Sequence, residues 1–260
     1  MPQPDSEQYK ARKNHYQRML TIYGRKPVLE ALQNTAIGVH RLHLASSNRP
    51  AKILDEIVAL AESRNIEISY KEKAALSRVS RNAKQDQGVA ADLLLERMRT
   101  LSDFAREPLP SGYPRYLVLD RIHNPQNIGM IIRSAAAGGI DALFIPEQGN
   151  AAISALVIKA SAGAIFKCPI VRCDTTEECI LVLKAKKIRI SMLSSHSPTS
   201  LQDAANQKGA IAYVLGNESD GVTQAVNALA DERCAIPMHN GVESLNVAVT
   251  AALIAFMPKP

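Results

Sequence analysis

Five polar residues between positions 115 and 260 could take part in chemistry, and they lie in three short segments. They are Asn127 and Arg133 in NPQNIGMIIRSAAAGG, Glu218 in LGNESDGV, and Ser244 and Asn246 in IPMHNGVESLNVAVTAAL. A guanidinium can clamp a phosphate through two parallel hydrogen bonds and can stabilise a developing alkoxide. Each residue type also has an ordinary structural role, because asparagine and serine cap helices and arginine pairs with acids. Three such segments in one half of the chain nevertheless favour a ligand site.

Other common catalytic signatures are absent from the sequence. No G-x-G-x-x-G or G-x-x-x-x-G-K-[ST] motif follows a strand, which argues against a nicotinamide-linked oxidoreductase and a P-loop enzyme. No G-x-S-x-G elbow supports a nucleophilic hydrolase. The four cysteines contain no C-x-x-C pair, so we expect reduced thiols and neither a metal site nor a disulfide framework.

The three polar segments follow short apolar runs that are typical of buried strands. These runs are RYLVLDRI, DALFIP, IRISMLSS, AIAYVLGNE and RCAIPM, with the predicted helices IGMIIRSAAAG and AISALVIKASAG between them. Runs with polar residues only at their ends indicate strands that helices cover on both faces, as in a parallel sheet. Open α/β sheets bind ligands at the carboxyl ends of their strands, which is where the three segments lie.

The first half of the chain predicts a smaller α/β domain. KPVLEALQN and AKILDEIVALAESRN read as helices, and VHRLHLA, IEISY and VAADLLLE read as strands. The stretch TLSDFAREPLPSGYP contains three prolines and a glycine and interrupts both patterns. We therefore expect a flexible basic arm over residues 1–20, a small domain over 21–99, a linker over 100–114 and a larger domain over 115–260.

Positive charge is concentrated in the first half. The chain has 31 Lys and Arg against 25 Asp and Glu, and residues 1–114 hold 18 basic and 13 acidic side chains. The first half is therefore the candidate surface for a polyanion. The longest apolar stretch, over residues 245–257, is shorter than the ~20 residues of a membrane span. With no secretory signal at the N-terminus, we expect a cytoplasmic protein without a membrane association.

The three polar segments resemble, in the same order, the signature motifs of the SpoU/TrmH group of SPOUT RNA 2'-O-ribose methyltransferases. The resemblance is close over residues 115–256. In the first half, IYGRKPVLEAL and DQGVAADL resemble the substrate-binding domain, similar in fold to a ribosomal protein, of the ribosomal-RNA branch. One departure is Asp86-Gln87, where many relatives carry His-Gln before Gly-Val.

The resemblance implies an α/β fold with a deep trefoil knot near the C-terminus, an exception to the rule that chains avoid knots. It also implies that S-adenosylmethionine is the cofactor and that the knot loops hold it. By resemblance, the cofactor-binding residues are Leu215, Gly216, Asn217, Ile236, Pro237, Met238, Ser244, Leu245 and Asn246.

The resemblance further assigns Asn127, Arg133 and Glu218 to catalysis, with Ser244 and Asn246 completing the site. The family's arginine has been proposed as the base, but a guanidinium with a pKa above 12 rarely gives up its proton. We therefore expect Arg133 to clamp an RNA phosphate and leave the proton acceptor unassigned. The expected substrate is ribosomal RNA, with transfer RNA as the alternative, and the expected assembly is a homodimer. An RNA-binding protein that has lost catalysis is the rival reading, against which the intact catalytic set argues.

Overall fold

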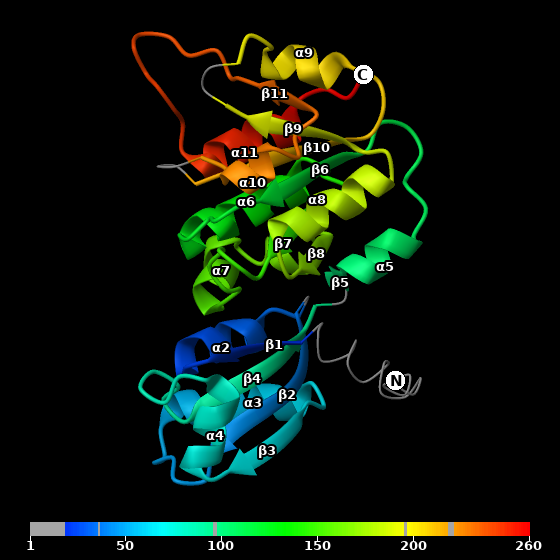
Figure 1. Cartoon of the computed structure of the whole chain (residues 1–260). Helices are drawn as coiled ribbons and strands as arrows, with labels where there is room; N and C mark the ends of the chain where they lie inside the picture. Colours follow the sequence, from blue (N-terminus) through cyan, green and yellow to red (C-terminus); the bar gives the residue numbers. More distant parts are fainter. Residues whose placement is uncertain (1–18, 36, 96–97, 195–196, 218–220) are drawn as a thin grey trace. The chain divides into compact units, whose positions relative to one another are not determined.

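The computed structural model describes residues 19–35, 37–95, 98–194, 197–217 and 221–260 (Figure 1). The chain divides into two compact units, Met1–Glu96 and Arg97–Pro260. The basic arm expected over residues 1–20 lies outside the described residues up to position 18, and the first described strand begins at Met19.

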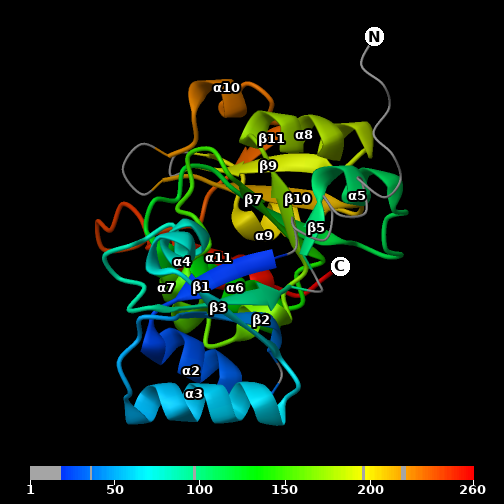
Figure 2. The same cartoon turned by 90° about the horizontal axis from the view of Figure 1, so that it is seen from below.

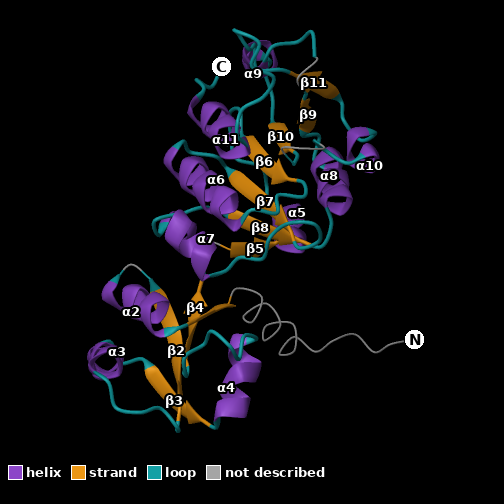
Figure 3. Cartoon of the chain, turned by 90° about the vertical axis from the view of Figure 1, so that its left-hand side faces the viewer, coloured by secondary structure: helices purple, strands orange, loops and turns teal. Residues whose placement is uncertain are grey.

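The N-terminal unit is a four-stranded sheet covered by helices. The sheet has the order β1-β4-β2-β3, in which only the β2–β3 pair is parallel. Its strands are β1 (Met19–Tyr23), β2 (Gly38–Ala45), β3 (Glu67–Lys71) and β4 (Val89–Leu94). Its helices are α2 (Arg25–Gln33), α3 (Lys52–Ser63) and α4 (Lys73–Ser80). Helices α2 and α3 lie side by side on one face (Figure 2), and α4 lies on the other (Figure 3). The predicted strands and helices of this unit are confirmed, whereas β1 and α4 were not predicted.

The C-terminal unit is built on a seven-stranded sheet with the order β11-β9-β10-β6-β7-β8-β5. Every neighbouring pair in it is parallel. The strands are β5 (Met98–Thr100), β6 (Arg115–Leu119), β7 (Ala142–Pro146), β8 (Ile170–Cys173), β9 (Arg189–Leu193), β10 (Ile211–Leu215) and β11 (Glu232–Cys234). All residues of β6, β7 and β10 are buried, which confirms the parallel sheet predicted from their unbroken apolar runs.

Helices cover both faces of this sheet (Figure 3). One layer contains α6 (Pro125–Ala137), α7 (Ala155–Ala160) and α11 (Val247–Phe256), of which α6 contacts both others. The opposite layer contains α5 (Leu101–Arg106), α8 (Thr176–Ala185) and α10 (Gln224–Asn227). The unit also contains the 3₁₀ helix η1 (Ala164–Phe166) and helix α9 (Leu201–Asn206). Among the described residues, no helix combines the length and apolar character of a membrane span.

A buried arginine holds the end of the last helix to the sheet. Arg115, at the start of β6, is 3% exposed. Its guanidinium donates hydrogen bonds to the carbonyl oxygens of Ile254, Met257 and Pro258 at 2.7–2.9 Å. Cations are favourable at a helix C-terminus, where the last carbonyls lack partners within the helix. Arg115 thus fixes α11 beside β6 and α6.

The segment expected as a linker over residues 100–114 differs in the structure. Strand β5 and helix α5 occupy residues 98–106, and only residues 107–114 lack regular secondary structure. Thr100 and Asp103 form a reciprocal capping box at the start of α5, and Leu101 and Phe104 are buried. The Phe104 ring packs edge-on against Phe144 with the centroids 4.9 Å apart. The prolines that suggested a linker all follow this helix.

Candidate active site

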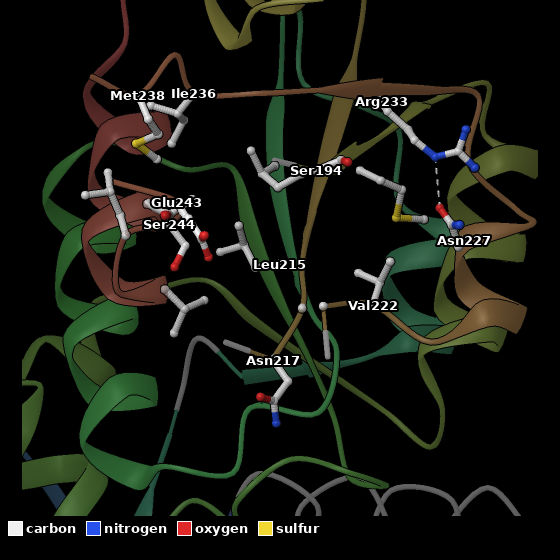
Figure 4. A pocket seen from close by; sticks show the side chains of 17 residues that line it. Ser194, Leu215, Asn217, Val222, Asn227, Arg233, Ile236, Met238, Glu243 and Ser244 are labelled. Atoms are coloured by element: carbon white, nitrogen blue, oxygen red, sulfur yellow. Dashed lines mark hydrogen bonds between the residues drawn. The ribbon is translucent and has the colours of Figure 1, made fainter. Parts of the chain in front are cut away.

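A cavity of about 450 Å³ opens at the carboxyl ends of β9 and β10 (Figure 4). Seven of the nine residues predicted to hold a cofactor line it: Leu215, Gly216, Asn217, Ile236, Met238, Ser244 and Leu245. Figure 4 shows Ile236, Met238, Glu243 and Ser244 on one side of this cavity, and Asn227 and Arg233 on the other. The second and third polar segments therefore converge on one site, as expected for the carboxyl edge of a parallel sheet.

Two predicted cofactor residues lie elsewhere. Pro237 lines a second cavity of about 690 Å³, which shares Ile236, Met238 and Glu243 with the first. Asn246 is not among the residues lining either cavity. Part of the cavity wall was not predicted from the sequence. It consists of Met192, Leu193 and Ser194 at the end of β9. The polar end of the predicted strand IRISMLSS was the signal that could have identified these three.

Gly216 allows the loop after β10 to fold back on itself. Asn217 and Gly221 exchange two backbone hydrogen bonds, with N–H···O distances of 3.0 and 2.9 Å. A Cβ atom at position 216 would lie 2.3 Å from the carbonyl carbon of Gly221 and 2.4 Å from the nitrogen of Val222. Only glycine fits this close backbone approach, so this residue is required by the shape of the loop that borders the cavity.

Arg121, which precedes the first polar segment and which no sequence pattern identified, ties the end of β6 to this loop. Its guanidinium donates a hydrogen bond to the carbonyl oxygen of Gly221, and its own carbonyl accepts one from the side chain of Asn217, both at 3.3 Å. Arg121 has a left-handed backbone, with φ of 57°. The preceding residue, Asp120, is buried and accepts hydrogen bonds from the Thr176 hydroxyl and the Thr223 N–H. These contacts fix the ends of β6 and β10 relative to each other.

Asn246 links the last helix to the first polar segment. Its side-chain oxygen accepts a hydrogen bond from the Ala248 N–H and caps α11, and its amide donates to the Asn127 side-chain oxygen at 3.2 Å. Asn127 is 4% exposed. Helix α11 begins only at Val247, because the segment before it has no regular structure and the Asn246 side chain is the cap. Two predicted catalytic residues, 119 positions apart, are thus in contact.

The structure does not bring Arg133 into the cavity of its own chain. Arg133 is exposed on α6 and is not one of the lining residues. It stands six positions after Asn127, so it lies roughly 9 Å further along the helix and on a different face. Glu218 lies outside the described residues. Within one chain, seven of the nine predicted cofactor residues line one cavity, but the predicted phosphate clamp stays on the outer surface.

Burial suppresses the reactivity of three of the four cysteines. All four are free and buried. Burial raises the pKa of Cys168 to about 12 and also raises the pKa of Cys179 and Cys234. A thiol must ionise to act as a nucleophile or a metal ligand, so these three remain inert at neutral pH. Within the described part of the chain, no group of three or more His, Cys, Asp or Glu side chains is placed to hold a metal ion.

Comparison with known protein families decides the assignment. Residues 114–256 match the family model described as "SpoU rRNA Methylase family", and residues 21–94 match "RNA 2'-O ribose methyltransferase substrate binding". The chain belongs to the SpoU rRNA methylase family. The two matched regions lie in the two compact units, so each unit of this SpoU family member has its own counterpart among known domains.

Relatives of this SpoU family member match it over most of its length. A protein of Xylella fastidiosa strain Temecula1, named "23S rRNA (guanosine-2'-O-)-methyltransferase RlmB", is 32% identical over 90% of this chain and 94% of its own length. A Mycobacterium bovis protein named "Uncharacterized tRNA/rRNA methyltransferase" is 29% identical over 90% of this chain and 72% of its own length.

Solved structures share the fold of the whole chain. An AdoMet-bound rRNA methyltransferase from Sinorhizobium meliloti has a TM-score of 0.62 at 21% identity, with 96% of this chain and 89% of that chain covered. The SpoU methyltransferase AviRb from Streptomyces viridochromogenes, in complex with AdoMet, has a TM-score of 0.62 at 22% identity, with 96% and 92% covered. At these identities the likeness establishes the α/β fold of both units.

Proposed function

We propose that this chain is an S-adenosylmethionine-dependent methyltransferase that modifies a ribose 2'-hydroxyl of ribosomal RNA. The observation that carries the proposal is the cavity at the ends of β9 and β10, which the second and third family motifs line together. The RlmB-named relative, aligned over 90% of the chain, supports ribosomal RNA as the substrate.

The residues of the cavity suit S-adenosylmethionine. Its volume of about 450 Å³ lies within the usual range for sites of small ligands, ~300–1,000 Å³. Leu215, Ile236 and Leu245 offer apolar surface for an adenine, and the Gly216–Asn217 backbone offers polar groups without side-chain bulk. Ser244 and Glu243 supply polar side chains on the same wall. When bound, the cofactor supplies an electrophilic methyl group on a sulfonium.

The protein's contribution to the reaction is chiefly orientation and electrostatics. The ribose oxygen must lie in line with the methyl group, and a well-oriented pair avoids several kcal/mol of barrier. Arg133 would hold an RNA phosphate through a bidentate contact and stabilise negative charge on the ribose oxygen as its proton leaves. The Asn127–Asn246 contact holds α6 against the start of α11, so that the elements carrying Arg133 and Ser244 keep a fixed relation. In this proposal Glu218 orients the guanidinium.

A homodimer would complete the site, because Arg133 lies outside the cavity of its own chain. Helix α11 has no charged residue, and a helix that is apolar all round is normally buried. Yet Val249, Leu253 and Phe256 are 48%, 43% and 63% exposed on one face of it. Met130 on α6 and Leu156 on α7 are also exposed, in the same helical layer.

The opposite face of α11 belongs to the core. Val247, Ala251 and Ile254 on that face are buried within the C-terminal unit. The exposed apolar face of α11, formed by Val249, Leu253 and Phe256, is available for a two-fold contact. Two-fold symmetry is the commonest symmetry of homo-oligomers. Such a contact would allow Arg133 of one protomer to serve its partner's cavity.

The alternative substrate is transfer RNA, which the name of the Mycobacterium bovis relative includes. We place the protein in the cytoplasm, where reduced thiols and ribosomal RNA occur together. Binding of S-adenosylmethionine to the purified protein, followed by transfer of labelled methyl groups to ribosomal or transfer RNA, separates these readings. Labelled 2'-O-methyl ribose in ribosomal RNA supports the proposal, and binding of RNA without cofactor binding would indicate a protein that has lost catalysis.

A further inference from the structure

The cavity at the ends of β9 and β10 carries one cation and one acid on opposite walls. Among the described residues that line it, Arg233 and Glu243 are the charged ones, and the others are apolar or neutral. Figure 4 shows Arg233 beside Asn227, across the cavity from Glu243. An anionic group of a ligand in this cavity therefore has one cation to meet, and that cation lies outside the three polar segments of the sequence.

The backbone of Arg233 is fixed at the rim of the cavity. Arg233 lies on β11 and is the partner of Met192 on β9, which also lines the cavity. The Arg233 carbonyl oxygen accepts a hydrogen bond from the Ser197 hydroxyl at 2.7 Å. Strand pairing on one side and this hydrogen bond on the other hold the point at which the side chain leaves the sheet.

The guanidinium of Arg233 is held by Asn227 at the end of α10. Its Nε donates a hydrogen bond to the Asn227 side-chain oxygen at 3.1 Å (Figure 4). The Thr223 side chain caps α10 by accepting from the Val226 N–H at 3.2 Å, and the Thr223 N–H donates to the buried Asp120 carboxylate at 2.8 Å. The position of the guanidinium is thus tied to the end of β6.

This hydrogen bond leaves most of the guanidinium for a ligand. A guanidinium has five N–H donors, and Nε uses one of them, so the four on the two terminal nitrogens stay available. Two parallel N–H donors match the two oxygens of a carboxylate. The arrangement is therefore a preorganised, end-on receptor for a carboxylate.

The acids next to Arg233 in the sequence are occupied by other cations. Glu232 pairs with Arg189 at 3.2 Å, and Asp231 pairs with Lys184 at 2.5 Å. Within the described part of the chain, Arg233 forms no ion pair of its own. Its charge is thus not neutralised by the fold, although it lies on the wall of the cavity.

The cofactor has one anionic group, the α-carboxylate of its amino-acid tail. Leu215, Ile236 and Leu245 offer the apolar surface for the adenine at its other end. Figure 4 shows Ile236 on the wall across from Arg233, so an adenine on that side directs the tail toward the guanidinium. Neither the adenine nor the sulfonium carries a negative charge that Arg233 could bind.

We propose that Arg233 binds the α-carboxylate of S-adenosylmethionine through its two terminal nitrogens. The proposal rests on the proposed function, because it names a cofactor contact of the same site. It makes Arg233 the residue by which the cavity selects adenosyl ligands that keep the amino-acid carboxylate.

The test is isothermal titration of four ligands into the full chain. S-adenosylmethionine and S-adenosylhomocysteine carry the carboxylate, whereas decarboxylated S-adenosylmethionine and 5'-methylthioadenosine lack it. Arg233→Gln should raise the Kd of the first two ligands roughly tenfold, because a charge-assisted pair of hydrogen bonds is lost, and should leave the Kd of the other two within about twofold of wild type. Arg233→Lys should recover part of the loss, since lysine keeps the charge without the fork.

Lys187→Gln is the matched control. Lys187 is exposed and precedes β9 at the end of the strand opposite to the cavity, so its substitution removes the same charge without touching the site. All four Kd values should stay at the wild-type level in this control. A loss in Lys187→Gln equal to that in Arg233→Gln would overturn the proposal, because the effect would then follow net charge instead of position.

Two results with Arg233→Gln would also overturn the proposal. One is a wild-type Kd for S-adenosylmethionine, and the other is an equal loss for all four ligands, which would indicate that Arg233 supports the cavity without binding the carboxylate. Failure of the proposed function is a separate outcome, in which the wild-type chain prefers the two carboxylate ligands but transfers no methyl group to RNA.

Discussion

Gly216→Ala tests whether the loop after β10 forms the cofactor cavity. The added Cβ would lie 2.3–2.6 Å from three backbone atoms of Gly221 and Val222, whereas ordinary contacts begin at 3.4 Å. The backbone of Gly221 and Val222 must therefore move by about 1 Å, since backbone atoms cannot rotate away as a side chain can. This movement would break the paired hydrogen bonds between Asn217 and Gly221.

The size of the effect follows from the cost of overpacking, which is roughly 1–3 kcal/mol for inserted methyl groups. If the strain is carried by the loop, the cofactor Kd should rise by roughly 5- to 150-fold, because each 1.4 kcal/mol corresponds to a factor of ten. Isothermal titration of S-adenosylmethionine into the full chain measures this directly.

Gly139→Ala provides the matched control for Gly216→Ala. Gly139 follows α6 with φ of 71°, and a Cβ atom added there would meet no other atom within 4 Å, so the substitution strains the backbone without closing a contact. This control should lower the melting temperature and leave the cofactor Kd within about twofold of wild type. A wild-type Kd in Gly216→Ala would refute the assignment of this loop to the cofactor.

Three further predictions concern the rest of the site and the core. Asn246→Ala should lower the free energy of unfolding by about 2–3 kcal/mol, because it removes the cap of α11 and a hydrogen-bond partner of the buried Asn127. Asn246→Ser keeps a capping oxygen and should recover about 1 kcal/mol of this loss. Urea titrations measure both values. Arg133→Ala should abolish methyl transfer and leave the cofactor Kd unchanged, and wild-type turnover in this variant would contradict the role of Arg133. Arg133→Lys should retain activity only if a positive charge is sufficient without the bidentate contact of a guanidinium. Burial raises the pKa of the Cys168 thiol from 9.0 to about 12, so its contribution to stability is complete below pH 9 and is lost as pH rises from 9 through 12. The difference in unfolding free energy between wild type and Cys168→Ala, measured across this range, should shrink with rising pH, and a constant difference would contradict the burial argument.

The sheet of the C-terminal unit could be predicted from sequence because burial on both faces leaves unbroken apolar runs. Strands β6, β7 and β10 were predicted for this reason. Helix α5 was missed because its short segment adjoins prolines, and its stability comes from its capping box and from the burial of Leu101 and Phe104. Strand β1 was missed because MLTIY is short and follows a polar segment, and its strand conformation depends on pairing with β4.

The site was predicted by resemblance to motifs, and its geometry was beyond the reach of the sequence. No local pattern indicates that the Asn246 amide meets Asn127, or that Arg121 reaches Gly221, because both contacts depend on how distant loops meet. Exposure of Arg133 likewise follows from the packing of α6 against α11. The trefoil knot and the homodimer stay predictions from the resemblance.

The central claim is that this chain methylates a ribose 2'-hydroxyl of ribosomal RNA, and mapping of 2'-O-methyl positions tests it most directly. Total RNA is compared between cells with the gene, cells without it, and deletion cells that express Arg133→Ala. The account predicts one 2'-O-methylated ribosomal nucleotide that disappears with the gene and is not restored by Arg133→Ala. An unchanged 2'-O-methylation pattern in all ribosomal RNA of the deletion cells would contradict it.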